Sequence, residues 1–218
     1  INGKQLRDAF ISGANNLCNR KAEVDALNVF PVPDGDTGTN MSMTIGNGAK
    51  ELEKLGDEAT VEEVAKVAAS GFLRGARGNS GVILSLLFRG FSKGMKGKET
   101  ATGADIAAAF SLGVEAAYKA VMKPVEGTIL TVIRESSEAL RQNIENINSI
   151  NKAMDYLLEQ ANISLKHTPE LLPVLKEVGV VDSGGAGYVT ILEGMYSALK
   201  GRFVEKKEMR FILRLLLI

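Results

Sequence analysis

An acidic loop carries the strongest chemical signal in this sequence. Residues 28–41 read NVFPVPDGDTGTNM, and Asp34 and Asp36 flank one glycine within them. Two carboxylates this close repel each other unless a cation lies between them, and hard oxygen ligands select Mg²⁺ or Ca²⁺ over zinc. The loop lacks the glycine and glutamate that an EF-hand needs at positions six and twelve. It predicts a cation site of another kind; the alternative is an Asp-Gly turn in which Asp36 or Thr37 caps a helix.

A second segment is rich in glycine and precedes a long apolar helix. Residues 70–85 read SGFLRGARGNSGVILS. Exposed amides at a helix N-terminus bind anions, so this segment predicts a phosphate site. It is not a P-loop, because GxxxxGK[ST] is absent, and no predicted strand precedes it as in a dinucleotide-binding fingerprint. The alternative is a corner between two closely packed helices.

Two further segments place small residues at predicted helix starts. They are Glu126-Gly127-Thr128 and residues 181–188, VDSGGAGY. Glycine costs about 1 kcal/mol in a helix interior, so clusters of it at helix ends indicate backbone that approaches something closely. Together the four segments predict that helix N-termini at one end of a bundle converge on a polyanion whose charge is shared with metal.

The elements that position these segments are predicted to be helices. Apolar residues recur at spacings of three and four in residues 103–122, 128–147 and 150–165. Thr60 to Glu63 reads as a capping box, Thr168 with Pro169 as a helix start, and Gly179 as a helix stop. Short connections favour antiparallel neighbours. The expected helices are 3–20, 39–55, 61–74, 79–96, 103–121, 128–147, 150–165, 169–178 and 185–200.

Composition excludes several classes of function. The 218 residues include 26 basic and 26 acidic side chains, so a chain without positive surplus is a poor candidate for non-specific binding of nucleic acid. An apolar fraction of 45% excludes general disorder. A single cysteine, Cys18, and a single histidine, His167, exclude a CxxC-type zinc site, and the lone cysteine favours a reducing, cytoplasmic compartment. No apolar run reaches the roughly 18–20 residues of a membrane span, so we expect no membrane insertion.

Four motifs together resemble a known family. PDGDTGTNM, GARGNSGVILS, EGTILTVI and DSGGAGYV are similar to the nucleotide-binding domain of the dihydroxyacetone kinase family, and more closely to the N-terminal domain of bacterial fatty acid kinases. The resemblance covers about residues 1–200. It implies an all-α, antiparallel up-down barrel of about eight helices, with ATP or ADP and two Mg²⁺ ions bound at one rim.

The resemblance also assigns site residues. It makes Asp34 and Asp36 the catalytic magnesium ligands. The family's third aspartate falls on Val29 here, so Asn28, a water or another carboxylate would complete the magnesium coordination. The implied nucleotide contacts are Thr37, Gly38, Asn40, Asn79, Ser80, Gly81, Thr128, Asp182, Gly184 and Gly185.

The implied reaction is phosphoryl transfer from ATP. No residue is an obvious general base, and we interpret His167 as a surface or capping residue. A carboxylate acceptor needs no base, because it is already ionised at pH 7. The resemblance implies a fatty acid as acceptor, held by a separate fatty-acid-binding protein, and an acyl phosphate as product. Three alternatives stay open: a regulatory or coactivator module with a retained nucleotide, a dihydroxyacetone-type kinase subunit, and a magnesium-dependent phosphatase.

Two features fall outside these motifs. Arg74, Arg77 and Arg89 could meet phosphates, a partner's acidic groups or only solvent. The chain divides into a nucleotide-binding kinase domain, residues 1–202, and a tail or start of a following segment, residues 203–218, and we interpret it as a fragment of a longer protein. The apolar stretch EMRFILRLLLI could begin a further domain or dock on a second copy to give a homodimer.

Overall fold

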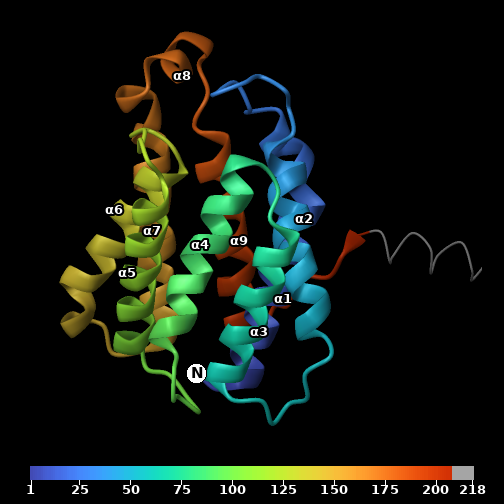
Figure 1. The fold of residues 1–218 in the computed structure, drawn as a ribbon. Coiled ribbons are helices and arrows are strands. Elements are labelled where there is room, and N and C mark those ends of the chain that lie inside the picture. Colours follow the sequence, from blue (N-terminus) through green and yellow to red (C-terminus); the bar gives the residue numbers. More distant parts are fainter. Residues whose placement is uncertain (208–218) are drawn as a thin grey trace, which may run out of the picture.

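The apolar periodicity of the sequence produces helices throughout the part of the chain that the structure describes. This computed structural model describes residues 1–207, in which the one strand-like pairing is an isolated bridge between Asn2 and Thr100. The prediction of an all-helical chain is confirmed. The α-helices of Figure 1 are α1 (Gly3–Asp25), α2 (Thr37–Leu52), α3 (Val61–Gly75), α4 (Gly78–Gly94), α5 (Gly103–Ala120), α6 (Ile129–Asn143), α7 (Ile150–Leu171), α8 (Pro173–Val178) and α9 (Ser183–Leu199).

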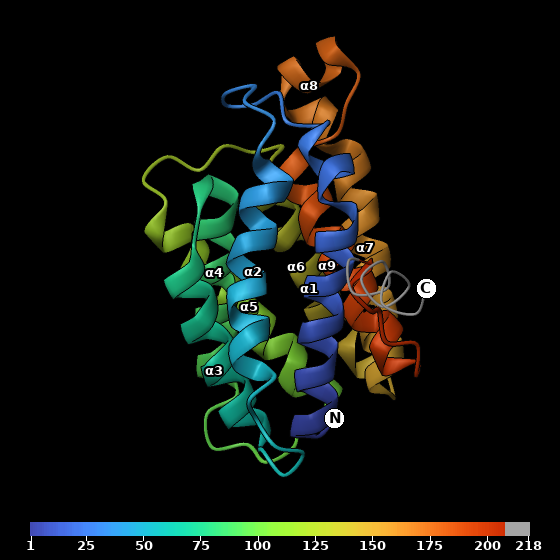
Figure 2. The same cartoon turned by 90° about the vertical axis from the view of Figure 1, so that its right-hand side faces the viewer.

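The eight long helices close into a ring. Each of α1 to α7 packs against the next in sequence, α7 packs against α9, and α9 closes the ring against α1. Consecutive helices run antiparallel, so the N-termini of α2, α4, α6 and α9 lie at the same end of the barrel as the short helix α8 (Figure 1). The chain's N-terminus lies at the opposite end (Figure 2). The predicted up-down barrel is therefore confirmed.

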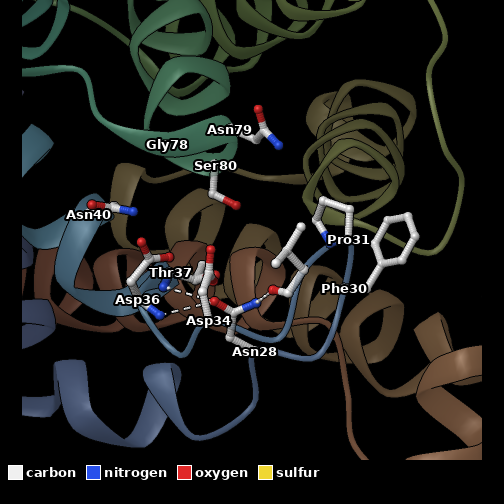
Figure 3. Close-up of a pocket in the computed structure, with 11 residues that line it drawn as sticks. Asn28, Phe30, Pro31, Asp34, Asp36, Thr37, Asn40, Gly78, Asn79 and Ser80 are labelled. Carbon is white, nitrogen blue, oxygen red and sulfur yellow. Dashed lines mark hydrogen bonds between the residues drawn. The ribbon is translucent and has the colours of Figure 1, made fainter.

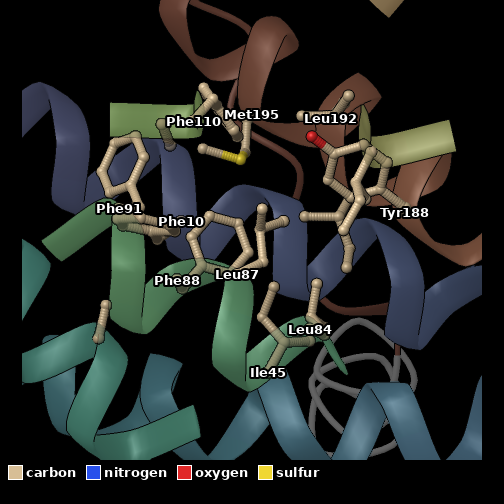
Figure 4. Close-up of a cluster of buried hydrophobic side chains, with 14 of the residues drawn as sticks. Phe10, Ile45, Leu84, Leu87, Phe88, Phe91, Phe110, Tyr188, Leu192 and Met195 are labelled. Atoms are coloured by element: carbon tan, nitrogen blue, oxygen red, sulfur yellow. The ribbon is translucent and has the colours of Figure 1, made fainter. Parts of the chain in front are cut away.

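Aromatic side chains fill the inside of the barrel. Phe10, Phe72, Phe88, Phe91 and Phe110 are at most 1% exposed, and seven pairs among them meet edge to face. Figure 4 labels four of these rings, those of Phe10, Phe88, Phe91 and Phe110. The ring centroids of the seven pairs lie 5.1–6.4 Å apart, which is the geometry that aromatic quadrupoles prefer. This packed core fixes the helices relative to one another, and with them the helix N-termini at the α8 end of the barrel.

The helix starts at the N-terminal end of the barrel are capped by their own side chains. Thr60 accepts the N–H of Glu63, and the Glu63 carboxylate accepts the N–H of Thr60, so the predicted capping box is confirmed. Thr102 and Asp105 make the same reciprocal pair at α5. These caps anchor helices far from the candidate site.

The predicted helix start at Thr168 is wrong, because α7 continues through Pro169 to Leu171. Proline lacks the N–H that would bond to the Leu165 carbonyl, and the Thr168 hydroxyl donates to that carbonyl instead, at 2.7 Å. The next helix starts at Pro173, with proline in the first turn, and ends at Gly179 with φ of 79°, as predicted for a helix stop. The helix expected over 128–147 also ends early, at Asn143, and a 3₁₀ turn follows over Ile144–Asn146.

After α9 the chain returns along α1. Asn15 donates to the carbonyl of Val204 at 2.9 Å, and Asn19 donates to the carbonyl of Glu205 at 2.9 Å. The boundary at 202/203 stays a prediction, and the apolar stretch 208–218 lies outside the described residues. Among residues 1–207, no helix combines the length and apolar character that a membrane crossing requires.

Candidate functional site

The acidic loop between α1 and α2 is organised from within by Asn28. This side chain is 6% exposed, and its amide nitrogen donates to the Val32 carbonyl at 3.0 Å. Its oxygen accepts the backbone N–H groups of Asp36, at 3.1 Å, and Thr37, at 3.2 Å (Figure 3). In this structure the Asn28 oxygen therefore accepts hydrogen bonds from the loop backbone, and its use as a third magnesium ligand stays a prediction.

The loop presents two carboxylates to a cavity. Asp34 and Asp36 both line a space of about 190 Å³, and no described residue donates a hydrogen bond to either side chain. Thr37 and Asn40 line the same cavity from the first turns of α2, and Asn28 contributes to its wall. The structure thus brings together the polar side chains of the acidic segment except that of Thr39, which is bonded to Asp25.

The N-terminus of α4 forms the facing wall. Gly78, Asn79 and Ser80 line the cavity, and Gly78 has φ of 65°, which favours glycine. Helix α4 begins without a side-chain cap. Its first amides can therefore receive an anion.

The N-termini of α2, α6 and α9 at this end are already bonded to protein side chains. Thr128 accepts the N–H of Leu130 at the start of α6, and Asp182 accepts the N–H of Gly185 at the start of α9. At α2, the N–H of Thr39 is bonded to Asp25. The four N-termini do converge, as expected, but α4 is the one among them whose first turn stays open, because the others have protein acceptors.

A second, more apolar cavity adjoins the first. It has a volume of about 360 Å³ and shares Phe30, Pro31, Asn79 and Ser80 with the first cavity. Apolar side chains of α4, α6 and the segment between α5 and α6 line most of it, namely Val82, Ile83, Val121, Val125, Ile129 and Leu130. Its further polar groups are Lys123, Thr128, Asp182 and Ser183. The two cavities together offer a polar compartment with carboxylates and an apolar compartment beside it.

Asp182 lies between the helix starts and is 5% exposed. Burial raises the pKa of its carboxyl to about 6, and the N–H groups of Gly185 and Ile129 lower it again in part. Its own N–H donates to the Thr168 hydroxyl at 3.1 Å. Ser183, the next residue, donates to the Thr37 hydroxyl at 3.2 Å and so joins the fourth segment to the first.

The four predicted glycine contacts have packing roles in this structure. None of Gly38, Gly81, Gly184 and Gly185 lines either cavity. A Cβ at Gly38 would meet Val24 of α1 at 2.8 Å, and one at Gly81 would meet the Thr44 hydroxyl of α2 at 2.5 Å. These glycines allow close helix contacts, and their use as phosphate contacts stays a prediction.

Other candidate residues lie away from the cavities. His167 is exposed on α7, and Arg74, Arg77 and Arg89 are exposed as well. None of these four lines either cavity. The structure also adds residues that were not predicted as contacts. Gly78, Lys123 and Ser183 line the cavities, and Asp25, which no local pattern marks, is bonded to Thr39.

The donor set fits magnesium held jointly with phosphate. Within residues 1–207 there is no group of three or more His, Cys, Asp or Glu side chains placed to hold a metal. Mg²⁺ is commonly bound by one or two carboxylates, with water and substrate phosphates as the other ligands. Asp34 and Asp36 are such a pair, beside the open amides of α4.

Comparisons with known proteins find similar sequences. A family model described as the DAK2 domain matches residues 31–197. An uncharacterized protein of Staphylococcus aureus (strain USA300) is 52% identical over 207 residues, which are 95% of this chain and 38% of that protein. The protein of strain MRSA252 matches equally. The chain therefore spans 38% of the length of these curated relatives.

Solved structures share the fold. A crystal structure of the dihydroxyacetone kinase from C. freundii in complex with AMP-PNP and Mg²⁺ matches with a TM-score of 0.65 and 13% identity, over 88% of this chain and 33% of that one. The native form of the same kinase matches with a TM-score of 0.56 and 17% identity, over 88% and 34%. At these identities the likeness concerns the fold.

Proposed function

The chain belongs to the DAK2 domain family, and on that premise we propose that it binds magnesium-ATP and transfers the γ-phosphate to a fatty acid carboxylate. The acyl chain would be presented by a separate fatty-acid-binding protein. One observation carries the proposal: Asp34 and Asp36, whose carboxylates bond to no residue among 1–207, share a cavity with the open N-terminus of α4. The kinase of similar fold was crystallised with AMP-PNP and Mg²⁺, which supports a nucleotide and magnesium here.

Each compartment has a task in this proposal. Asp34 and Asp36 would hold two Mg²⁺ ions together with phosphate oxygens, and the bound cations would neutralise charge that shifts toward the leaving ADP. The amides of Asn79 and Ser80 would receive phosphate oxygens at the α4 N-terminus. The apolar cavity beside them has room for the adenine base.

The sequence offers no obvious general base, which supports a carboxylate acceptor over an alcohol. An alcohol must lose a proton during transfer, whereas a carboxylate oxygen is already ionised. It can form a bond to the γ-phosphorus while the bridging P–O bond breaks and its electron pair leaves with ADP. In the described chain the lone histidine, His167, lies on the surface of α7 and lines neither cavity.

The test measures product with and without the acyl carrier. This chain and a longer protein that contains it would each be mixed with Mg-ATP, with either free fatty acid or a fatty-acid-loaded binding protein. ADP and hydroxylamine-trapped hydroxamate would then be measured. We expect hydroxamate to form from the longer protein and loaded carrier, and little from this chain with free fatty acid, because half of the site is then missing.

Two outcomes would contradict this assignment. Rapid product from this chain with free fatty acid would refute the divided site. No product under any condition, with a bound nucleotide that does not exchange, would favour the regulatory module. Dihydroxyacetone in place of the fatty acid tests the remaining kinase alternative, and phosphate release from phosphate esters tests the phosphatase.

A further inference from the structure

Helix α2 begins in an unusual way. Asp36 occupies its N-cap position, where an aspartate side chain ordinarily accepts the N–H of the second or third helical residue. Here Asp36 has φ of −123° and ψ of 2° and makes no capping hydrogen bond. The carboxylate that could cap the helix faces the cavity with Asp34 instead.

The capping bond is made by a residue of another helix. Asp25, the last residue of α1, accepts the N–H of Thr39 at 2.9 Å through Oδ1. Its Oδ2 accepts the Thr39 hydroxyl at 2.7 Å. Thr39 is the third residue of α2, so Asp25 takes the donor that Asp36 would otherwise take.

Gly38 makes this arrangement possible. It is buried, and a Cβ there would meet Val24 at 2.8 Å and the Asp25 nitrogen at 3.1 Å. The absent side chain lets the last turn of α1 approach the first turn of α2. Asn28 meanwhile accepts the N–H groups of Asp36 and Thr37. Three backbone N–H groups at the start of α2 are thus bonded to Asn28 and Asp25, and none of them is bonded to the side chain of Asp34 or Asp36.

We propose that Asp25 is a positioning residue of the cation site, which caps α2 from α1 and so leaves the Asp36 carboxylate free to bind Mg²⁺. The inference rests on the proposed magnesium-nucleotide function and adds a residue to it. Asp25 does not line either cavity, so it acts through Thr39 and Asp36 and does not act as a ligand.

The binding experiment compares Asp25→Ala with Asp25→Asn by calorimetric titration of ATP in the presence of Mg²⁺. Asp25→Ala should weaken binding about tenfold, as expected for the loss of a group that orients a metal ligand. Asp25→Asn keeps an oxygen acceptor for the Thr39 N–H and should stay within about threefold of the wild type. Equal losses in both variants would overturn the capping role in favour of a charge effect.

A matched control lies at the other end of the barrel. Asp105 accepts the N–H of Thr102 at 2.9 Å and its hydroxyl at 3.0 Å, so it also bonds both donors of one threonine, as Asp25 does with Thr39. Asp105→Ala should lower stability without changing the affinity for Mg-ATP. A comparable loss of affinity in that variant would show that any lost cap has this effect, and would overturn the proposal.

A second measurement needs no nucleotide. In urea unfolding, Asp36→Ala should change the unfolding equilibrium constant by less than about twofold in the wild type, and by about fivefold in the Asp25→Ala background, where Asp36 has become the cap. Equal effects in both backgrounds would overturn the exchange of caps. A wild-type chain that binds no Mg-ATP would instead overturn the proposed function, and this cycle would then decide the role of Asp25 alone.

Discussion

Arg134 of α6 donates to the Glu126 carboxylate at 3.1 Å and thereby ties the segment between α5 and α6 to the barrel. Tyr118 donates to the same carboxylate at 3.2 Å, and the Thr131 hydroxyl donates to it as well. Burial alone would raise the pKa of Glu126, but hydrogen bonds from Thr131 and Arg134 outweigh it and hold this pKa below its usual value. The tied segment supplies part of the apolar cavity's wall.

Glu126→Ala should therefore loosen that wall. Val121 and Val125 line the apolar cavity, so we expect ATP to bind about fivefold more weakly while tripolyphosphate binds as before. Hydrogen exchange of residues 121–128 should become faster. Glu138→Ala is the control, because Glu138 also contacts Arg134, at 3.5 Å, but lies on α6 itself. Equal weakening of ATP and tripolyphosphate would argue against a wall that contacts the base.

Asp182→Asn should change how stability depends on pH. The pKa of Asp182 is about 6 in the folded chain and 3.8 in the reference state, so its contribution to stability is fully present below pH 3.8 and is lost as pH rises through about 6. The difference corresponds to about 3 kcal/mol. Between pH 4 and pH 7, the free energy of unfolding in urea should fall by up to about 3 kcal/mol more in the wild type than in the variant. Parallel pH profiles for the two proteins would contradict a buried, raised carboxyl.

Two glycines of α2 should respond oppositely to alanine. Outside the backbone of α2 itself, nothing lies within 4 Å of a Cβ built at Gly46, whereas one at Gly48 would overlap the Phe72 ring. We expect Gly46→Ala to stabilise the fold by about 0.5–1 kcal/mol, because glycine is a poor helix former. Gly48→Ala should destabilise it by about 1–3 kcal/mol through overpacking. Thermal unfolding measures both, and a loss of stability in Gly46→Ala would mean that this position has an unseen contact.

Much of the fold was predictable because its signals are local. The capping box at Thr60 and the stop at Gly179 depend on a few neighbouring residues, and both are confirmed. Pro169 misled the prediction, since its missing N–H is replaced by the hydroxyl of Thr168, a compensation that the helix-start pattern does not distinguish. The ring of helices followed from short connections and from the family resemblance together.

The candidate site was predictable where the residue type and its local spacing alone indicate the chemistry. Asp34, Asp36, Asn79 and Ser80 do line the expected cavity. Asp25 was not predictable, because its partner Thr39 is 14 residues away and their contact depends on how α1 and α2 cross. The glycines were ambiguous for the same reason: a missing Cβ serves a phosphate or a neighbouring helix equally well, and only the packing distinguishes them.

The strongest test of the site is the removal of one carboxylate at a time. Asp34→Asn and Asp36→Asn keep the size of each side chain and remove a negative charge from the cavity. We expect each to weaken magnesium-dependent binding of ATP more than about a hundredfold, since ligands count for more than the groups that orient them. Stability should not fall, because like charges then no longer repel across the loop. Calorimetric titration with and without Mg²⁺ measures the effect.

The control is Asp57→Asn. Asp57 lies between α2 and α3, at the other end of the barrel, and its carboxylate pairs with Arg7 of α1. Unchanged affinity in both cavity variants would mean that the two carboxylates hold no cation and that the nucleotide, if bound, is recognised without one.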